Sequence, residues 1–257
     1  ARQIIILILK KTILFNMNIL VCISCVPDTT SKISFNENNE LVKEDLQFII
    51  GPYDDYALSR AVELKEEDES IKVNVINVGM SENDSLLRRS LAVGADHAYR
   101  INIKPNDSNQ VSYLISDFIK DKEYDLILMG KESIDFNSGI VHHLVASNLG
   151  YNSLSPVSSL SIIDDGLVQV DLEKDESIQK IQVNTPIVLG CQEPIAEWKI
   201  PNMRGIMNAR TKEIKVIENG KIDSGINYKK FNTPDKRSKM KYFQVDDIPK
   251  LIDELNL

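Results

Sequence analysis

Two cysteines near the start of the chain are the first candidates for chemistry. Cys22 and Cys25 have the spacing of redox-active and metal-binding pairs. A redox pair is expected at a helix N-terminus, where the helix dipole lowers the pKa of a thiol. This pair instead stands late in a short apolar run that starts at Asn18 and favours a buried strand ending at Pro27. We therefore expect two structural cysteines.

The histidines and the known catalytic motifs suggest no catalytic group. His142 and His143 are adjacent in a predicted helix and are expected to face different directions, and His97 lies in a turn. The sequence contains neither a GxSxG nor an HExxH motif. We expect surface or packing histidines, and a carrier, sensor or scaffold rather than a hydrolase.

A loop of small and polar residues, Gly130–Gly139, joins a predicted strand to the N-terminus of a predicted helix. Such a junction offers backbone N–H groups and the positive end of a helix dipole to an anion. Ser138 and Gly139 would let the backbone approach a phosphate closely. The loop matches neither a Walker motif nor GxGxxG, so it indicates either a nucleotide or phosphate site or an ordinary turn.

Further loops are expected at the same edge of the sheet. One follows the first strand, and another follows the strand predicted over 72–78. A third is the helix entry Gly51–Asp55, with Asp54 as a possible N-cap and Tyr53 able to stack on a ring. In a parallel sheet these loops converge with 130–139 at the carboxyl ends of the strands, where open α/β sheets bind ligands.

Alternating strands and helices position these loops. Strands are predicted over 18–26, 72–78, 98–101 and 125–129, and helices over 54–66, 81–93, 111–119 and 141–149. Ser81 is the expected cap of the second helix, and Gly94 its end. A hairpin over 157–172 and strands over 178–183 and 187–189 add an antiparallel part. The order predicts an α/β fold whose mostly parallel sheet is sandwiched by helices.

Composition and charge narrow the function classes. The chain has 257 residues, 42% of them apolar and 26% charged, as expected for a globular protein of one large or two small domains. A net charge of -8 argues against a general nucleic-acid binder. Three cysteines are few and odd in number, which indicates a reducing compartment.

The two ends of the chain differ from the middle. Residues 1–16 hold an apolar stretch too short to span a membrane and without a signal-peptide cleavage site. Because Met17 directly precedes the first strand, we expect residues 1–16 to be a non-native extension. Beyond Gly190 the chain is expected to be irregular, with a last short helix over 246–255. The lysine-rich stretch 219–243 is either a solvated arm, a patch for an anionic surface, or a segment laid against a partner.

Five segments together resemble the beta-subunit family of electron transfer flavoproteins. In order, they are Val21–Thr29, Ala57–Glu66, Leu91–Asp96, Asp125–Asp135 and Ile200–Arg210. The resemblance runs from about Met17 to about Glu218. It implies an adenine-nucleotide alpha hydrolase-like (Rossmann-like) α/β domain over 17–218 and a C-terminal arm, 219–257, that packs on a partner subunit.

The resemblance also implies a function. Members are cytoplasmic electron carriers in bacteria, without a catalytic constellation of their own, and form a heterodimer with an alpha subunit that holds FAD. The common type binds AMP in the beta subunit. It passes electrons from acyl-CoA or other flavin dehydrogenases to a quinone oxidoreductase, with no nucleic-acid partner and no membrane insertion. Two alternatives stay open: an electron-bifurcating member with a second FAD in place of AMP, and a stand-alone nucleotide-binding sensor.

The family's cofactor-binding positions fall on loops named above. They are Cys22, Ser24, Thr29, Gly51, Pro52, Tyr53, Asp54, Val78, Asp135, Asn137, Ser138, Gly139, Ile140 and Val141. Among them, Thr29 and Tyr53 would lie near the flavin ring. The run Gly-Ile-Val at 139–141 replaces a more polar one, so AMP, another nucleotide or no nucleotide remain possible.

Residues 191–201 resemble the recognition loop with which the family docks on dehydrogenases. The candidate contacts are Glu193, Pro194, Ile195, Ala196, Glu197 and Trp198. Residues 192–196 read Gln-Glu-Pro-Ile-Ala, where the commoner family pattern is Asn-Glu-Pro-Arg-Tyr. The identity of the dehydrogenase partner therefore stays open.

Overall fold

The computed structural model describes residues 17–38, 40–42, 44, 46–218, 226 and 240–255. The chain divides into two units, Ala1–Lys32 with Glu44–Asn227, and Ile33–Lys43 with Tyr228–Leu257. The predictions for the N-terminal extension and for most of the lysine-rich stretch lie outside the described residues. Within the described part, no helix is both long enough and apolar enough to cross a membrane.

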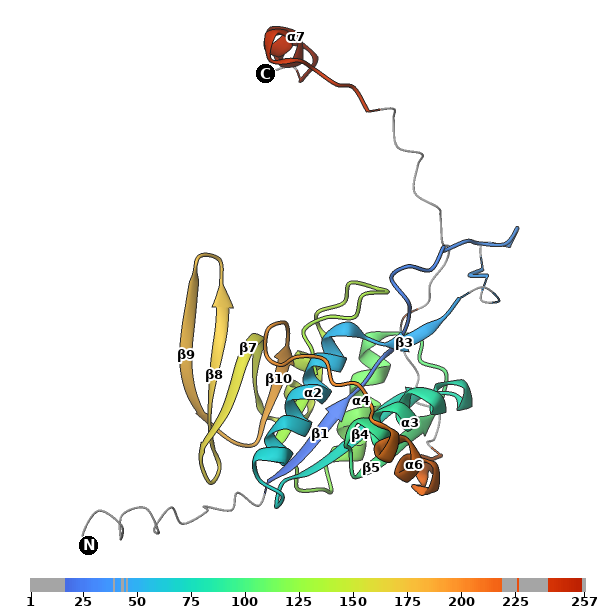
Figure 1. Ribbon diagram of the computed structural model, residues 1–257, viewed down its shortest axis with the longest axis vertical. Helices are drawn as coiled ribbons and strands as arrows, with labels where there is room; N and C mark the ends of the chain where they lie inside the picture. Colours follow the sequence, from blue (N-terminus) through green and yellow to red (C-terminus); the bar gives the residue numbers. More distant parts are fainter. Residues whose placement is uncertain are drawn as a thin grey trace, which may run out of the picture. The chain divides into compact units, whose positions relative to one another are not determined.

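A nine-stranded sheet organises the larger unit (Figure 1). Its strands are β1 (Asn18–Cys22), β4 (Lys72–Gly79), β5 (His97–Asn102), β6 (Leu126–Gly130), β7 (Asn152–Asp164), β8 (Leu167–Lys174), β9 (Ser177–Asn184), β10 (Ile187–Cys191) and β11 (Ile214–Ile217). The order is β11-β5-β4-β1-β6-β10-β7-β8-β9. Pairing is parallel from β11 to β7 and antiparallel from β7 to β9, which confirms the predicted fold class.

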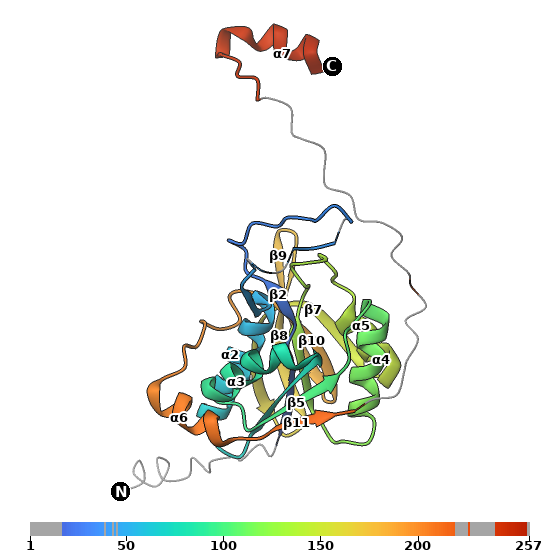
Figure 2. The same ribbon diagram turned by 90° about the vertical axis from the view of Figure 1, so that its right-hand side faces the viewer.

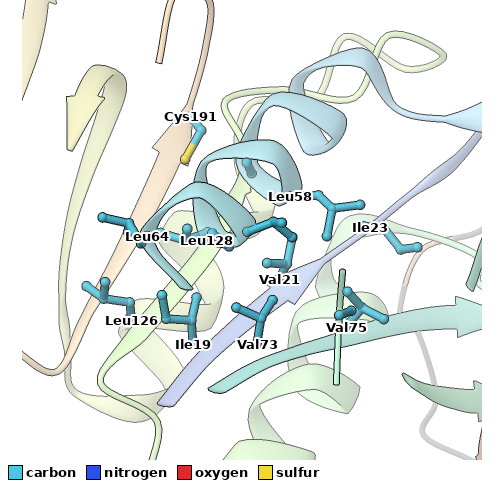
Figure 3. Close-up of a cluster of buried hydrophobic side chains, with 14 of the residues drawn as sticks. Ile19, Val21, Ile23, Leu58, Leu64, Val73, Val75, Leu126, Leu128 and Cys191 are labelled. Carbon is cyan, nitrogen blue, oxygen red and sulfur yellow. The ribbon is translucent and has the colours of Figure 1, made fainter. Parts of the chain in front are cut away.

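Helices cover both faces of this sheet. They are α2 (Pro52–Glu67), α3 (Asp84–Val93), α4 (Ser108–Ile119), α5 (Val141–Leu149) and α6 (Met203–Thr211). Figure 2 shows α2, α3 and α6 on one side and α4 and α5 on the other. Successive residues of a strand face opposite sides, so Ile19 and Val21 pack with Leu58 of α2 (Figure 3), whereas Leu20 joins the second core cluster, with Val145 of α5.

The predicted first strand is interrupted after Cys22. Residues Cys25–Pro27 form a separate strand, β2, which pairs antiparallel with β3 (Phe48–Ile50). The break occurs because the backbone N–H of Ser24 donates to the Asp54 carboxylate at 2.8 Å instead of continuing the ladder. The end at Pro27 is as predicted, but it is the end of β2.

Both predicted helix caps are wrong. α2 begins after Gly51, which has no side chain to cap it, with Pro52 in its first turn, and the Asp54 carboxylate instead accepts from the backbone N–H of Gly130 at the end of β6. The helix after β4 begins with a 3-10 turn over Ser81–Asn83, likewise without a side-chain cap, before α3 starts. The predicted end of α3 at Gly94 is confirmed.

The chain after Gly190 is more regular than the sequence suggests. The Asn202 side chain accepts from the backbone N–H of Gly205 at 2.8 Å and caps α6. β11 then adds an edge strand parallel to β5. The expectation of an irregular chain is therefore confirmed for residues 192–202 and wrong for residues 203–217. In the smaller unit, the predicted last helix appears as a 3-10 turn (Val245–Asp247) followed by α7 (Ile248–Leu255).

Candidate functional site

Asp54 joins three segments at the edge of the sheet where β4, β1, β6 and β10 end, which we call the carboxyl edge. Its Oδ2 accepts from the backbone N–H of Ser24 at 2.8 Å and from the Ser24 hydroxyl at 2.5 Å. Its Oδ1 accepts from the backbone N–H of Gly130 at 2.7 Å. One carboxylate thus ties the segment after β1, the first turn of α2 and the end of β6 together.

Burial raises the pKa of Asp54 from 3.8 to about 6, because the donors from Ser24 and Gly130 offset only part of the loss of water. All of these hydrogen bonds are internal to the protein. Asp54 lies at the carboxyl edge, and its carboxylate is engaged in holding that edge together. Its contribution to a cofactor site stays a prediction.

Gly51 lies where this arrangement leaves no room for a side chain. A Cβ at Gly51 would stand 2.4 Å from the Ser24 hydroxyl and 2.6 Å from Asp54 Oδ2. The backbone N–H of Gly51 donates to the Ser24 carbonyl at 3.3 Å. Close approach of two chain segments thus explains the glycine.

Cys22 is packed in the core at the end of β1, and burial raises the pKa of its thiol. A raised pKa makes the reactive thiolate scarce, as expected of a structural cysteine. Among the described residues, no group of three or more His, Cys, Asp or Glu side chains could hold a metal ion.

The end of β4 is joined to the end of β1 by an amide chain. Asn77 Nδ2 donates to the carbonyl of Ile23 at 2.8 Å, and Asn83 Nδ2 donates to Asn77 Oδ1 at 2.8 Å. Val78, predicted at the cofactor site, is 8% exposed beside them. The structure thus brings the predicted loops after β1, before α2 and after β4 to the carboxyl edge, where Gly130 also begins the fourth loop.

The fourth loop, between β6 and α5, closes on itself. Ser133 and Ser138 form an isolated β-bridge, and Asn137 adopts a positive φ of 49° in between. The Asp135 carboxylate is engaged within the loop, where it accepts from the Ser133 hydroxyl and from the backbone N–H of Phe136. Ser138 Oγ lies 2.9 Å from Ser108 Oγ at the start of α4, so this loop also touches the segment after β5.

The start of α5 fits an anion through its backbone. Its first N–H groups have no acceptor inside the helix, and Ile140 and Val141 stand at this end. A Cβ at Gly139 would press on the Lys131 carbonyl oxygen at 3.3 Å, so the loop backbone comes close to Gly139 and favours a residue without a side chain. These features suit a phosphate group.

His142 is buried behind this helix start. It is 2% exposed, its Nε2 has no hydrogen-bond partner among the described residues, and burial lowers its pKa to about 4. A Cβ at Gly190 would lie 3.0 Å from this Nε2 and 2.4 Å from Ser155 Oγ. The ring centroids of His142 and His143 lie 4.1 Å apart, yet His142 is buried and His143 is exposed, so the two side chains face the core and the solvent as expected.

Thr29 and Tyr53, both predicted to lie near a flavin, are in different surroundings. Thr29 is exposed in the turn after β2. Tyr53 stands in the first turn of α2, with the Lys131 ammonium 4.8 Å from its ring centroid. Lys131 was not predicted as a functional residue. The available signal was a cation inside the loop Gly130–Gly139, which was considered as a phosphate site.

Residues 192–199 include all six predicted partner contacts, and we call them the docking segment. They lie along α2. Trp198 is 52% exposed and packs on Tyr56 with ring centroids 5.3 Å apart. The backbone N–H of Lys199 donates to the buried Ser59 hydroxyl at 3.0 Å. Ile195 is only 6% exposed and belongs to the core, and Ala196 packs against that core. Ile195, expected to contact a partner, is therefore an anchor of the segment.

Other predicted partner residues are accessible, and three unpredicted ones join them. Glu193, Pro194 and Glu197 are exposed. Ile200 is 86% exposed, and Met203 and Met207 of α6 are 74% and 63% exposed. Met203 and Met207 are four residues apart and so share a helix face. That spacing was the available signal, but it could not reveal that the face is uncovered.

Comparison with known proteins identifies the family. The model of the family described as electron transfer flavoprotein domain matches residues 39–221. The electron transfer flavoprotein subunit beta of Bacillus subtilis (strain 168) is 32% identical over 80% of this chain and 81% of its own. That of Syntrophomonas wolfei is 27% identical over 92% of both chains. The caffeyl-CoA reductase-Etf complex subunit CarD of Acetobacterium woodii is 28% identical over 78% of both. The chain therefore belongs to the electron transfer flavoprotein family, among the beta subunits, and its role is in electron transfer.

Proposed function

We propose that this chain is the beta subunit of a heterodimeric electron transfer flavoprotein of the bacterial cytoplasm. It pairs with an alpha subunit that holds FAD, binds AMP at its carboxyl edge and has no catalytic constellation of its own. It receives electrons from acyl-CoA or other flavin dehydrogenases and passes them to a quinone oxidoreductase. The main support beyond family membership is the convergence of the loops around Asp54 beside the start of α5.

The AMP site proposed here uses backbone more than side chains. The N–H groups at the start of α5 would hold the phosphate, and the backbone of Cys22 and Val78 would border the adenine. Tyr53 and Thr29 would face the flavin of the alpha subunit. The C-terminal arm, 219–257, would pack on that subunit, and Glu193, Pro194, Glu197 and Trp198 would contact the dehydrogenase.

Co-expression with an alpha subunit of the same organism tests this proposal. The purified complex should contain both chains and show flavin absorbance, and acid denaturation should release one FAD and one AMP per heterodimer. A well-folded complex without flavin would contradict the proposal. Two FAD and no AMP would instead support the bifurcating alternative, for which NADH-dependent reduction is a second check.

The sensor alternative predicts a homodimer that binds ATP without an alpha subunit. Deleting residues 191–257 is not a clean test of it, because this removes Cys191 from β10 together with α6 and the sheet strand β11. Measuring the mass of the intact chain and its ATP affinity, alone and with the alpha subunit, separates the two hypotheses without a truncation.

A further inference from the structure

A chain of polar contacts runs from the carboxyl edge to the docking segment through Gln192. This side chain is 7% exposed. Its Oε1 accepts from Lys131 Nζ at 3.1 Å, and its Nε2 donates to Glu173 Oε2 at 2.5 Å. The amide therefore lies between a cation and an anion, and these two charges fix which end is oxygen.

Opposite charges at its two ends polarise the amide. Hydrogen bonds in such a chain strengthen one another, because each bond increases the dipole that the next one meets. Gln192 is also fixed by its backbone, whose N–H donates to the Val157 carbonyl at 2.9 Å. Gln192 thus fixes the start of the docking segment on the sheet.

Lys131 connects Gln192 to the first turn of α2. Its backbone N–H donates to the Cys191 carbonyl at 2.9 Å, directly before Gln192. Its ammonium stands 4.8 Å from the ring centroid of Tyr53, within the range of a cation–π interaction. One side chain therefore contacts both Tyr53 and Gln192.

The rest of the docking segment is held along the same helix. Tyr56 packs on Trp198, and its hydroxyl pairs with Glu193. Loss of water is the larger cause of the raised pKa of Tyr56, and the hydrogen bond with Glu193 raises it further. The Lys199 ammonium pairs with Glu66 at 2.7 Å. If Gln192 moves relative to Tyr53, either the contacts of Lys131 with these two residues or the position of α2 must therefore change.

We propose that Lys131 is a positioning residue that couples the flavin side of the carboxyl edge to the docking segment. This rests on the proposed function, in which Tyr53 faces the flavin. An aromatic cofactor beside Tyr53 changes the electrostatic surroundings of the ammonium, and Gln192 transmits that change to the segment that meets the dehydrogenase. The result is reciprocal: cofactor occupancy alters docking, and docking alters cofactor affinity.

Hydrogen exchange in the heterodimer tests this coupling, with FAD bound and with FAD removed. The reporters are the backbone N–H of Ile195, bonded to the Gln192 carbonyl at 3.0 Å, and that of Lys199. In the wild-type complex, removing FAD should speed exchange in residues 192–199 by about fivefold or more. In Lys131→Met this difference should fall to about onefold, and Lys131→Arg should restore most of it.

Lys120→Met is the matched control: it makes the same substitution at the C-cap of α4, where the lysine pairs with Asp117 at 2.5 Å and contacts neither Tyr53 nor Gln192. It should respond to FAD removal like the wild type. If Lys131→Met does not assemble, Gln192→Leu should show the same loss of response. A wild-type complex without flavin would overturn the proposed function, and this inference with it. A flavin-bearing wild-type complex whose docking segment ignores FAD removal would overturn this inference alone. So would a response in Lys131→Met and Gln192→Leu that is as large as in the wild type.

Discussion

The α2 side and the α5 side of the carboxyl edge hold their buried polar groups in opposite ways. On the α2 side, the Asp54 carboxylate accepts from two backbone N–H groups and one hydroxyl. On the α5 side, His142 Nε2 has no partner among the described residues and lies against Gly190. The first group is fixed by hydrogen bonds, and the second by shape.

This difference predicts how each side tolerates change. The stability of the α2 side should depend on the Asp54 carboxylate, because loss of this acceptor leaves buried donors without a partner. A site fixed by shape is sensitive to added volume and to protonation, because there is neither room nor an acceptor for the new group. Both groups titrate within reach of ordinary buffers, which makes the comparison measurable.

Removing the acceptor should have the largest effect. Asp54→Ala leaves the backbone N–H groups of Ser24 and Gly130 without their acceptor and should lower the free energy of unfolding by about 4 kcal/mol. Asp54→Asn keeps one of the two accepting oxygens, because the amide nitrogen cannot accept, and should lose less stability than Asp54→Ala. Urea unfolding at pH 7 measures both. Equal losses in the two variants would show that charge, not acceptance, holds this side.

The two sides should respond to pH with opposite sign. The pKa of Asp54 in the fold is about 6, above its usual 3.8, so its contribution to stability is present below pH 3.8 and is lost as pH rises through 6. The pKa of His142 is about 4, below its usual 6.5, so stability falls as pH drops from 6.5 to 4. Each contribution amounts to roughly 3 kcal/mol, and in the wild type they largely cancel between pH 4 and 6.

Single variants should separate these contributions. Asp54→Asn should lose stability as pH falls from 6.5 to 4.5, relative to the wild type, because the opposing His142 effect remains. His142→Gln should gain stability over the same interval. The measurement is urea unfolding at both pH values. Wild-type pH dependence in both variants would mean that neither group titrates as its burial predicts.

Added volume should disturb the α5 side. Gly190→Ala places a Cβ 2.4 Å from Ser155 Oγ and 2.8 Å from Ser155 Cβ, and should cost about 2 kcal/mol. Because both close contacts come from one side chain, adding Ser155→Gly should recover most of the loss. Thermal unfolding of the single and double variants measures this. No recovery in the double variant would point to His142 as the obstacle instead.

Much of the fold was predictable because its signals are local. β4, β6, α4 and α5 follow from short apolar runs and helical spacing, and the parallel sheet follows from their order. The break after Cys22 was not, because it depends on a hydrogen bond to a carboxylate 30 residues later. β11 was missed for the same reason: its pairing partner, β5, lies more than a hundred residues earlier.

The candidate site shows the same division. The rule that parallel strands end at one edge placed the loops correctly. It could not assign roles, because an aspartate in the first turn of a helix fits an N-cap as well as an internal acceptor. Nor could the sequence show that Ile195 is buried while Ile200 is exposed, since both are apolar residues in a segment without periodicity.

Ser24→Ala should have the smallest effect and test the α2 side most finely. It removes the hydroxyl that donates to Asp54 at 2.5 Å but keeps the backbone donors of Ser24 and Gly130. The loss should be about 1 kcal/mol, since one hydrogen bond goes and no buried donor is stranded. The Asp54 pKa should also rise further, because the lost bond favours the charged form. NMR titration of the Asp54 carboxyl carbon measures this shift. An unchanged or lower pKa would mean that, of the three donors, only the backbone N–H groups influence the pKa of Asp54.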